Sequence, residues 1–202
     1  MSEKILINSK KSKIAKEFLK KVKNADVLCP SKKNWDMKNV DFKSHQIKKI
    51  ISADKILLLQ SIISSNKFIK RKQKEILHQV SINLISIIKI CEIALEKNKN
   101  VKIIVLGYAS GIKGSYDIVY DLMKTSLHKY MEERRINYPK QQLICISPST
   151  IIDLRPRFKR KDKKNILKSV RNNPKKRGIM SFEIVELIYN IFYKTTDYVT
   201  NT

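Results

Sequence analysis

Five short apolar segments alternate with helical patterns along the chain, and this alternation restricts the fold more than any other feature. The segments are dense in Ile, Leu and Val without regular polar alternation, as expected for strands buried on both faces of a parallel sheet. They are Lys4–Asn8, Asp26–Cys29, Lys55–Gln60, Lys102–Tyr108 and Gln142–Ser147. The pattern predicts an α/β fold with a doubly wound parallel sheet and right-handed crossovers.

Apolar residues between these segments recur at spacings of three and four, which predicts amphipathic helices. The predicted helices cover about 14–22, 70–97, 116–134 and 181–193, and Ser181 is the expected N-cap of the last one. At 202 residues, 42% of them hydrophobic, the chain can bury the core of one domain and is short for two. We therefore expect a single domain over 1–202.

The three cysteines and the apolar runs bear on the compartment. Cys29, Cys91 and Cys145 are scattered and odd in number, which predicts free thiols and no metal site. No apolar run approaches the roughly 20 residues needed to cross a membrane, and the first residues lack the pattern of a secretory signal. The expectation is a cytoplasmic protein with no membrane partner.

The formal net charge of +25 attracts polyanions, so nucleic acid has to be considered as a partner. Lysines are spread over every segment, however, and Ile and Asn are abundant with them. This distribution favours a compositional bias and a solvated surface over one anion-binding face. Aromatic residues are only 7% and no nucleic-acid motif is present, so this partner is the least favoured.

Tyr120 and Lys124 lie one helical turn apart in a predicted helix that follows an apolar strand. This spacing puts both side chains on one face. An ammonium near a phenol favours the phenolate, so such a tyrosine can exchange a proton with an alcohol or a carbonyl. In a chain this rich in lysine the same spacing also arises by chance.

The surroundings of this pair resemble the short-chain dehydrogenase/reductase family over nearly the whole chain and in the right order. The matching segments are the active-site region at 105–127, the asparagine-bearing helix at 80–86, the turn at 146–150, the closing helix at 173–187 and the segment 197–200. The resemblance implies a Rossmann-like sheet. Because the chain stops at Thr202, before the family's final strand, we expect that last strand to be missing.

The resemblance also implies roles for individual residues. Tyr120 would be the general acid/base, and Lys124 would depress its pKa and hold the nicotinamide ribose. Asn83 would position a water in the proton relay, the alternative being a helix residue bonded to nearby backbone. The family's catalytic serine has no counterpart: its place falls on Tyr108 or nearer Gly107, and Tyr108 and Ser110 are the candidate replacements.

The cofactor end departs further from the family. The family's glycine-rich turn corresponds to Asn8–Ala15, which contains no glycine, although those glycines allow a tight turn and close approach to a pyrophosphate. Ser31, Lys32 and Lys33 would suit a ribose 2′-phosphate, so NADP is expected before NAD. The resemblance assigns cofactor contacts to Ser9, Ser12, Lys32, Asp36, Lys124 and Pro148.

The segment 155–177, rich in Lys, Arg and Asn, corresponds to the family's substrate lid. It implies an anionic small-molecule substrate, or else a solvated basic loop. Three functions therefore stay open: a divergent NAD(P)-dependent oxidoreductase acting on a carbonyl or alcohol, a catalytically impaired partner subunit, and a basic nucleic-acid-binding protein. In the family the helices that carry Asn83 and Tyr120 form subunit contacts, which implies a homo- or hetero-oligomer.

Overall fold

A computed structural model of the chain describes residues 2–30, 35–64, 66–109, 115–154, 167–168 and 170–200. Its centre is one parallel sheet in the order β2-β1-β3-β4-β5. The strands are β1 (Lys4–Ile7), β2 (Asp26–Leu28), β3 (Lys55–Leu58), β4 (Lys102–Leu106) and β5 (Gln142–Ile146). All five predicted strands are confirmed, each one to two residues shorter at its carboxyl end.

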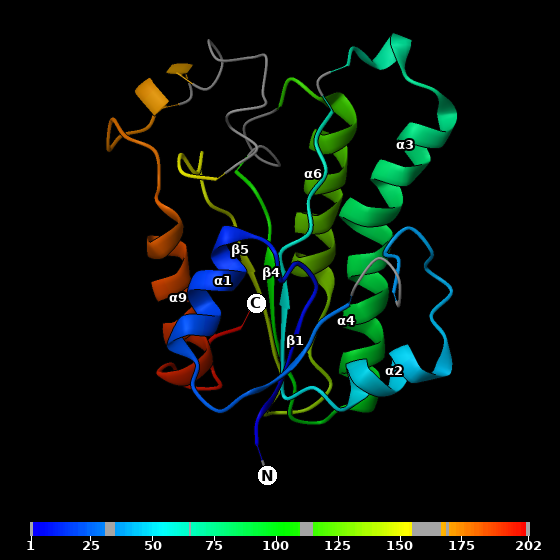
Figure 1. Cartoon of the computed structure of the whole chain (residues 1–202), viewed down its shortest axis with the longest axis vertical. Coiled ribbons are helices and arrows are strands. Elements are labelled where there is room, and N and C mark those ends of the chain that lie inside the picture. The colour runs from blue at the N-terminus through cyan, green and yellow to red at the C-terminus, as the bar shows by residue number, and fades with distance from the viewer. Residues whose placement is uncertain are drawn as a thin grey trace.

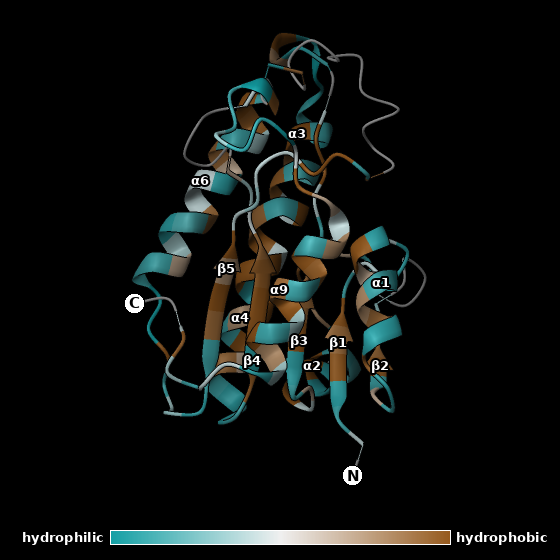
Figure 2. Ribbon diagram, turned by 90° about the vertical axis from the view of Figure 1, so that its left-hand side faces the viewer, coloured by the Kyte–Doolittle hydropathy of each residue, from teal (hydrophilic) through white to brown (hydrophobic). Residues whose placement is uncertain are grey.

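Helices cover both faces of the sheet (Figure 1), which confirms the doubly wound α/β fold. One face carries α1 (Lys13–Lys21) and α9 (Ser181–Tyr193), whose apolar side chains form a core cluster with Ile5, Ile7 and Leu57. The other face carries α2 (Ser44–Ile51), α4 (Ser86–Lys97) and α6 (Ile118–Glu133). Figure 2 shows the strands as the most hydrophobic part of the molecule, because side chains on both of their faces are buried.

The long predicted helix begins at Gln73 and contains a π-helical turn. It runs as α3 (Gln73–Val80), the π segment η2 (Ser81–Ile85) and α4, and it follows a short 3-10 helix, η1 (Phe68–Lys70). In the described part of the chain, Gln73–Lys97 is the one helix long and apolar enough to span a membrane. Its residues Ile87, Ile90 and Ala94 are fully buried in the core, as in the core helix of a globular domain.

Two local features differ from the sequence expectations. Helix α2 was not predicted, because only Gln46 and Ile50 are buried on it and the apolar pattern is too sparse. The N-cap of α9 is Met180 and not Ser181, whose hydroxyl donates instead to Asp153 and Glu17. The prediction for Ser181 was wrong because a distant carboxylate competes for its hydroxyl.

The edge of the sheet at β5 is covered by the segment 196–200. The Gln142 side chain donates to the carbonyls of Thr196 and Val199, and the Thr200 hydroxyl bonds the backbone of Leu143. These bonds satisfy polar groups along an edge strand that would otherwise be open to pairing with another chain. Of the basic segment 155–177, residues 155–166 and 169 lie outside the described residues.

Candidate functional site

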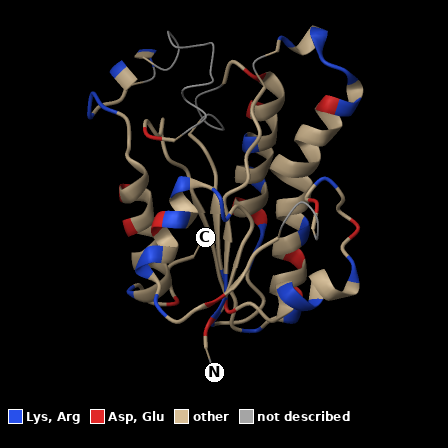
Figure 3. Ribbon diagram, in the orientation of Figure 1, with Lys and Arg blue, Asp and Glu red and all other residues tan. Residues whose placement is uncertain are grey.

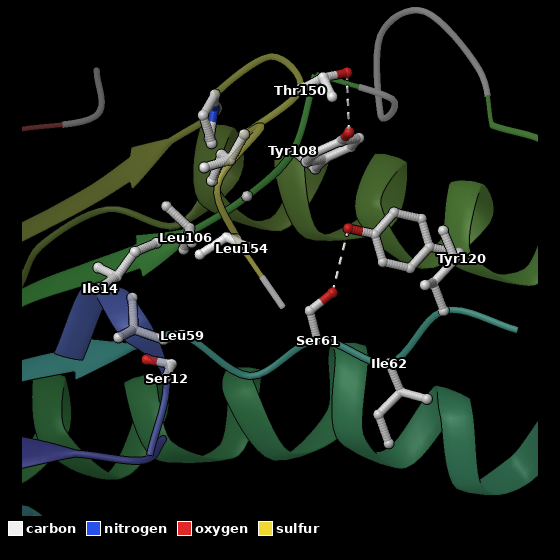
Figure 4. A pocket seen from close by; sticks show the side chains of 14 residues that line it. Ser12, Ile14, Leu59, Ser61, Ile62, Leu106, Tyr108, Tyr120, Thr150 and Leu154 are labelled. Atoms are coloured by element: carbon white, nitrogen blue, oxygen red, sulfur yellow. Dashed lines mark hydrogen bonds between the residues drawn. The ribbon is translucent and has the colours of Figure 1, made fainter. Parts of the chain in front are cut away.

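A pocket of about 400 Å³ lies at the carboxyl edge of the sheet, where ligands bind in doubly wound folds. Its walls come from the segments that follow β1, β3, β4 and β5 and from α6 (Figure 4). Most of the lining is apolar, and the hydroxyls come from Ser12, Ser61, Tyr108, Tyr120 and Thr150. The pocket reaches from the N-terminus of α1 at Ser12 to the side chain of Tyr120.

The Tyr120 phenol is 5% exposed, and its oxygen accepts a hydrogen bond of 3.2 Å from the Ser61 hydroxyl (Figure 4). Tyr120 belongs to the first turn of α6, which Asp117 caps by accepting from the Tyr120 backbone N–H. Ser61 follows β3 by three residues, so its placement depends on how that strand ends. Sequence reasoning missed Ser61, because no pattern around it predicts contact with a residue 59 positions away.

Tyr108 lies against Tyr120 but directs its hydroxyl elsewhere. The two rings pack edge to face with centroids 5.9 Å apart. The Tyr108 hydroxyl shares a 3.5 Å hydrogen bond with the Thr150 hydroxyl. Tyr108 therefore contributes its ring to the wall beside Tyr120, and the other candidate, Ser110, lies outside the described residues.

Lys124 is on the same face of α6 as Tyr120, as its spacing implies, but its ammonium is fully buried. The Nζ atom donates to the Leu106 carbonyl at 3.2 Å and lies 5.8 Å from the centroid of the Tyr120 ring. Burial lowers the pKa of Lys124 to about 8. Lys124 is not among the residues that line the pocket, so in this conformation its contact with Tyr120 is through the ring.

Asn83 is buried inside the π segment η2 and binds one residue of the loop after β3 at two points. Its Oδ1 accepts from the backbone N–H of Ile62 at 2.8 Å, and its Nδ2 donates to the Ile62 carbonyl at 2.7 Å. This pair of bonds imitates strand pairing and fixes the residue next to Ser61. The alternative considered from the sequence, a bond to nearby backbone of its own helix, is replaced by a bond to this loop.

The same loop is anchored by a buried ion pair between Arg71 and Asp117. The Asp117 carboxylate accepts from Arg71, from the Gln79 amide and from the Ser64 backbone N–H, at 2.7 to 2.8 Å. Burial alone would raise the pKa of Asp117, but these bonds outweigh it and hold the pKa below its ordinary value. The network joins the loop after β3, α3 and the first turn of α6, and so fixes Ser61 relative to Tyr120.

No protein-family model matches the chain, and no curated protein matches its sequence. Solved structures do match the whole fold. A short chain dehydrogenase family protein from Francisella tularensis superposes with a TM-score of 0.77 over 100% of this chain and 95% of its own, at 15% identity. A short chain dehydrogenase from Leptospira borgpetersenii with bound NAD+ gives 0.79 over 100% and 89%, at 18% identity. A small-chain dehydrogenase in complex with NADPH gives 0.80 over 100% and 95%, at 12% identity.

The fold is that of the short-chain dehydrogenases. The resemblance seen in the sequence is confirmed at this level, since the likeness covers the full chain in each case. Each of these identities is too low to carry an activity from the matched protein to this one. The site residues are therefore judged by their own geometry.

In this short-chain dehydrogenase fold, the turn between β1 and α1 is closed by its own side chains. Ser12 caps α1 by accepting from the Ala15 backbone N–H, and its own N–H donates to the Ser9 carbonyl. Lys13 pairs with Asp153 and Glu17, so its charge is already neutralised. Ser12 lines the pocket, whereas Ser9 does not.

The other predicted cofactor contacts are divided in the same way. Pro148 lines the pocket. The Asp36 carboxylate is exposed, accepts from the Lys38 backbone N–H and is not part of the lining. Lys32, with its neighbours Ser31 and Lys33, lies outside the described residues.

Gly107, one of the two positions to which the family's serine could correspond, has no room for a side chain. A Cβ atom there would lie 2.6 Å from the Ser147 hydroxyl and 2.7 Å from the Cys145 sulfur. Ser147 in turn bonds the ring of His128 at 3.0 Å, so this side of β4 is filled by a polar cluster behind the pocket. Among the described residues no group of three or more His, Cys, Asp or Glu side chains could hold a metal ion.

Proposed function

We propose that the protein is an NAD(P)-dependent oxidoreductase that interconverts a carbonyl compound and an alcohol, with Tyr120 exchanging the proton. One observation carries this proposal: the Tyr120 hydroxyl meets the Ser61 hydroxyl at the edge of a pocket placed where this fold binds ligands. The structures with bound NAD+ and with NADPH support the choice of cofactor class.

The described residues fit the two ends of such a cofactor by different means. The pocket is continuous from Ser12 to Tyr120, and its apolar walls with Pro148 and Thr150 suit a nicotinamide ring. At the diphosphate end no glycine admits close backbone approach, and Lys13 is paired with Asp153. The exposed Lys10 and Lys11 of this turn would supply the attraction, so we expect weaker binding than a glycine-rich turn gives.

The residues of the chain divide the remaining work. Bound NAD(P)H supplies the hydride, and the protein supplies position and the proton. Tyr120 protonates the carbonyl oxygen, and Ser61 donates a hydrogen bond to the Tyr120 oxygen as its negative charge develops. Lys124, cationic below its pKa of about 8, stabilises that charge from behind the ring.

The lining favours a substrate whose carbonyl sits on an apolar carbon chain. Ile62, Ile63 and Leu154 bound the pocket beside the hydroxyl pair. The basic residues from which an anionic group on the substrate was expected lie within 155–166, outside the described residues. The anionic substrate therefore stays a prediction of the sequence.

The test is a titration of NADPH and of NADH into the protein at physiological salt, followed by calorimetry or nucleotide fluorescence. We expect saturable binding, and we expect a Tyr120→Phe variant to bind equally while losing turnover. Absence of binding at millimolar cofactor would refute the proposed oxidoreductase function. Full turnover by Tyr120→Phe would refute the acid/base role of the Tyr120 phenol but not the oxidoreductase function.

A second function, that of a catalytically impaired partner subunit, is favoured by the position of Lys124. Its ammonium bonds the Leu106 carbonyl and not the pocket, and Lys13 is engaged by Asp153. In this role the helices that carry Asn83 and Tyr120 would serve a subunit contact, since α3, η2 and α6 pack together and expose apolar side chains. Failure of cofactor binding, together with a stable oligomer, would select this function.

A further inference from the structure

The loop between β3 and α3 ends in a convex tip that combines exposed apolar and basic side chains. Phe68 is 52% exposed and Ile69 89%. Four exposed lysines flank them, and we call these six residues the basic tip: Lys67, Phe68, Ile69, Lys70, Lys72 and Lys74. The chain carries no acidic residue from Lys55 to Lys74, and the first carboxylate is Glu75.

The basic tip is held in shape from beneath. The Arg71 guanidinium points inward, donates twice to the Asn66 carbonyl and pairs with the buried Asp117. The four lysines, in contrast, form no ion pair within the described parts of the chain. Arg71 therefore fixes the loop, whereas the four lysines of the basic tip face solvent.

The position of the basic tip adds to its composition. It stands above α3, at the end of the molecule where the strands of the sheet terminate (Figure 1), and Lys and Arg dominate this part of the ribbon (Figure 3). The mostly apolar pocket opens from the same edge of the sheet. A surface reached by the basic tip would therefore lie on the side of the molecule that carries the pocket.

We propose that the basic tip binds the surface of an anionic lipid bilayer, with Phe68 and Ile69 entering the interface and the lysines contacting headgroups. Exposed apolar side chains flanked by lysines suit the surface of an anionic bilayer, where negatively charged headgroups overlie an apolar acyl region. A duplex or single strand of nucleic acid would match the lysines but gives an aliphatic Ile69 nothing to stack on. A membrane-spanning segment is not required, and binding is peripheral.

The test is cosedimentation of the full chain with phosphatidylcholine vesicles, with and without phosphatidylglycerol, at physiological ionic strength. We expect binding only where phosphatidylglycerol is present, and a loss of about tenfold or more in affinity for Phe68→Ser/Ile69→Ser. A similar loss is expected when Lys67, Lys70, Lys72 and Lys74 are all changed to Gln. All six positions are exposed, so circular dichroism should show an unchanged fold.

Matched controls separate the basic tip from the charge of the whole molecule. Changing the exposed Lys11, Lys16, Lys20 and Lys23 of the α1 region to Gln removes the same charge, and Phe182→Ser/Leu187→Ser removes two exposed apolar side chains from α9. Both controls should bind as the wild type does. Equal losses in the tip and control variants, or no vesicle binding by the wild type, would overturn the proposal. So would tip variants that weaken binding to an RNA or DNA oligonucleotide, or that dissociate an oligomer, while vesicle binding is unchanged.

Discussion

Lys124 is a cation in the core, and its effect on the free energy of unfolding helps to distinguish a catalytic role from a structural one. The ammonium is fully buried and bonds one carbonyl, that of Leu106. A buried charge destabilises the fold unless its interactions compensate for the hydration that it loses. The depressed pKa of Lys124 implies that the ammonium lowers the stability of the fold, and a measured gain in stability on its removal would favour a role in proton transfer at Tyr120 over the partner-subunit function.

We expect Lys124→Met to raise the free energy of unfolding at pH 7, by up to about 3 kcal/mol, from the depressed pKa. Below pH 8 both states are protonated, so the penalty is fully present. Between about 8 and 10.5 the unfolded state binds more protons, so wild-type stability rises with pH, and this rise should vanish in the variant. Urea unfolding of both proteins across this range measures the difference. A less stable variant at pH 7 would show that the bond to Leu106 outweighs desolvation.

Ser61 is the residue that the structure adds to the site. If the wild type turns over a carbonyl substrate with NADPH, Ser61→Ala should lower kcat by at least about tenfold, because the developing charge on the Tyr120 oxygen loses a donor. Cofactor affinity should not change, and Ser61→Thr should restore turnover. Steady-state kinetics with a separate binding titration distinguish these effects. Tyr108→Phe is the matched control, and a larger loss there or in Ser110→Ala would assign the second hydroxyl to the position expected from the sequence.

At the level of single residues, the sequence predicted which side chains share a helix face, but it did not predict contacts between residues far apart in the chain. Tyr120 and Lys124 share a face because four residues make about one turn. The direction of the Lys124 ammonium depends on burial under β4, and the Ser61 contact joins residues brought together by the sheet. Neither is encoded in local spacing, so neither could be read from the sequence.

Among the larger elements, the loop after β3 is held in place by Arg71. We expect Arg71→Met to lower the free energy of unfolding by about 3 kcal/mol, because it leaves the Asp117 carboxylate buried without its cation. The folded pKa of Asp117 lies below its ordinary 3.8, so its contribution is present above that pH and is lost as the pH falls through the folded value. The variant should therefore begin acid unfolding at a higher pH. Thermal and acid unfolding measure both effects, with Lys72→Met at the exposed neighbour as the control.

Elements with a strong apolar pattern were predictable from the sequence. Elements that bury few apolar residues, or whose contacts are to distant residues, were not. The strands and the helices over 118–133 and 181–193 bury continuous apolar faces, which the sequence shows directly. Helix α2 buries little, and the π turn at η2 carries Asn83, whose side chain bonds the distant Ile62. Weak amphipathicity and distant hydrogen bonds leave no period to detect.

For the molecule as a whole, the alternation of strands and helices determined the fold, but the charge did not determine a partner. The sheet order β2-β1-β3-β4-β5 follows from crossovers that place each helix on one face or the other. Lysines are distributed over many elements, and several of them pair with carboxylates, such as Lys21 with Glu186 and Lys102 with Asp197. The lysines of the basic tip differ from these because no carboxylate among the described residues pairs with them.

The exposed apolar side chains of the molecule gather partly on adjoining helices, which predicts a subunit contact. Ile118 and Leu122 lie one turn apart on α6, which packs against α3 and η2. Leu77 of α3 and Ile85 of η2 are exposed as well. We expect the wild type to have the mass of an oligomer in size-exclusion chromatography with light scattering. Ile118→Glu/Leu122→Glu should shift it to the mass of one chain, because charges placed in an apolar contact cannot be hydrated there. Phe182→Glu/Leu187→Glu on α9 should not. A wild type with the mass of a single chain would show that this apolar face has another use, and would leave the site to act within one chain.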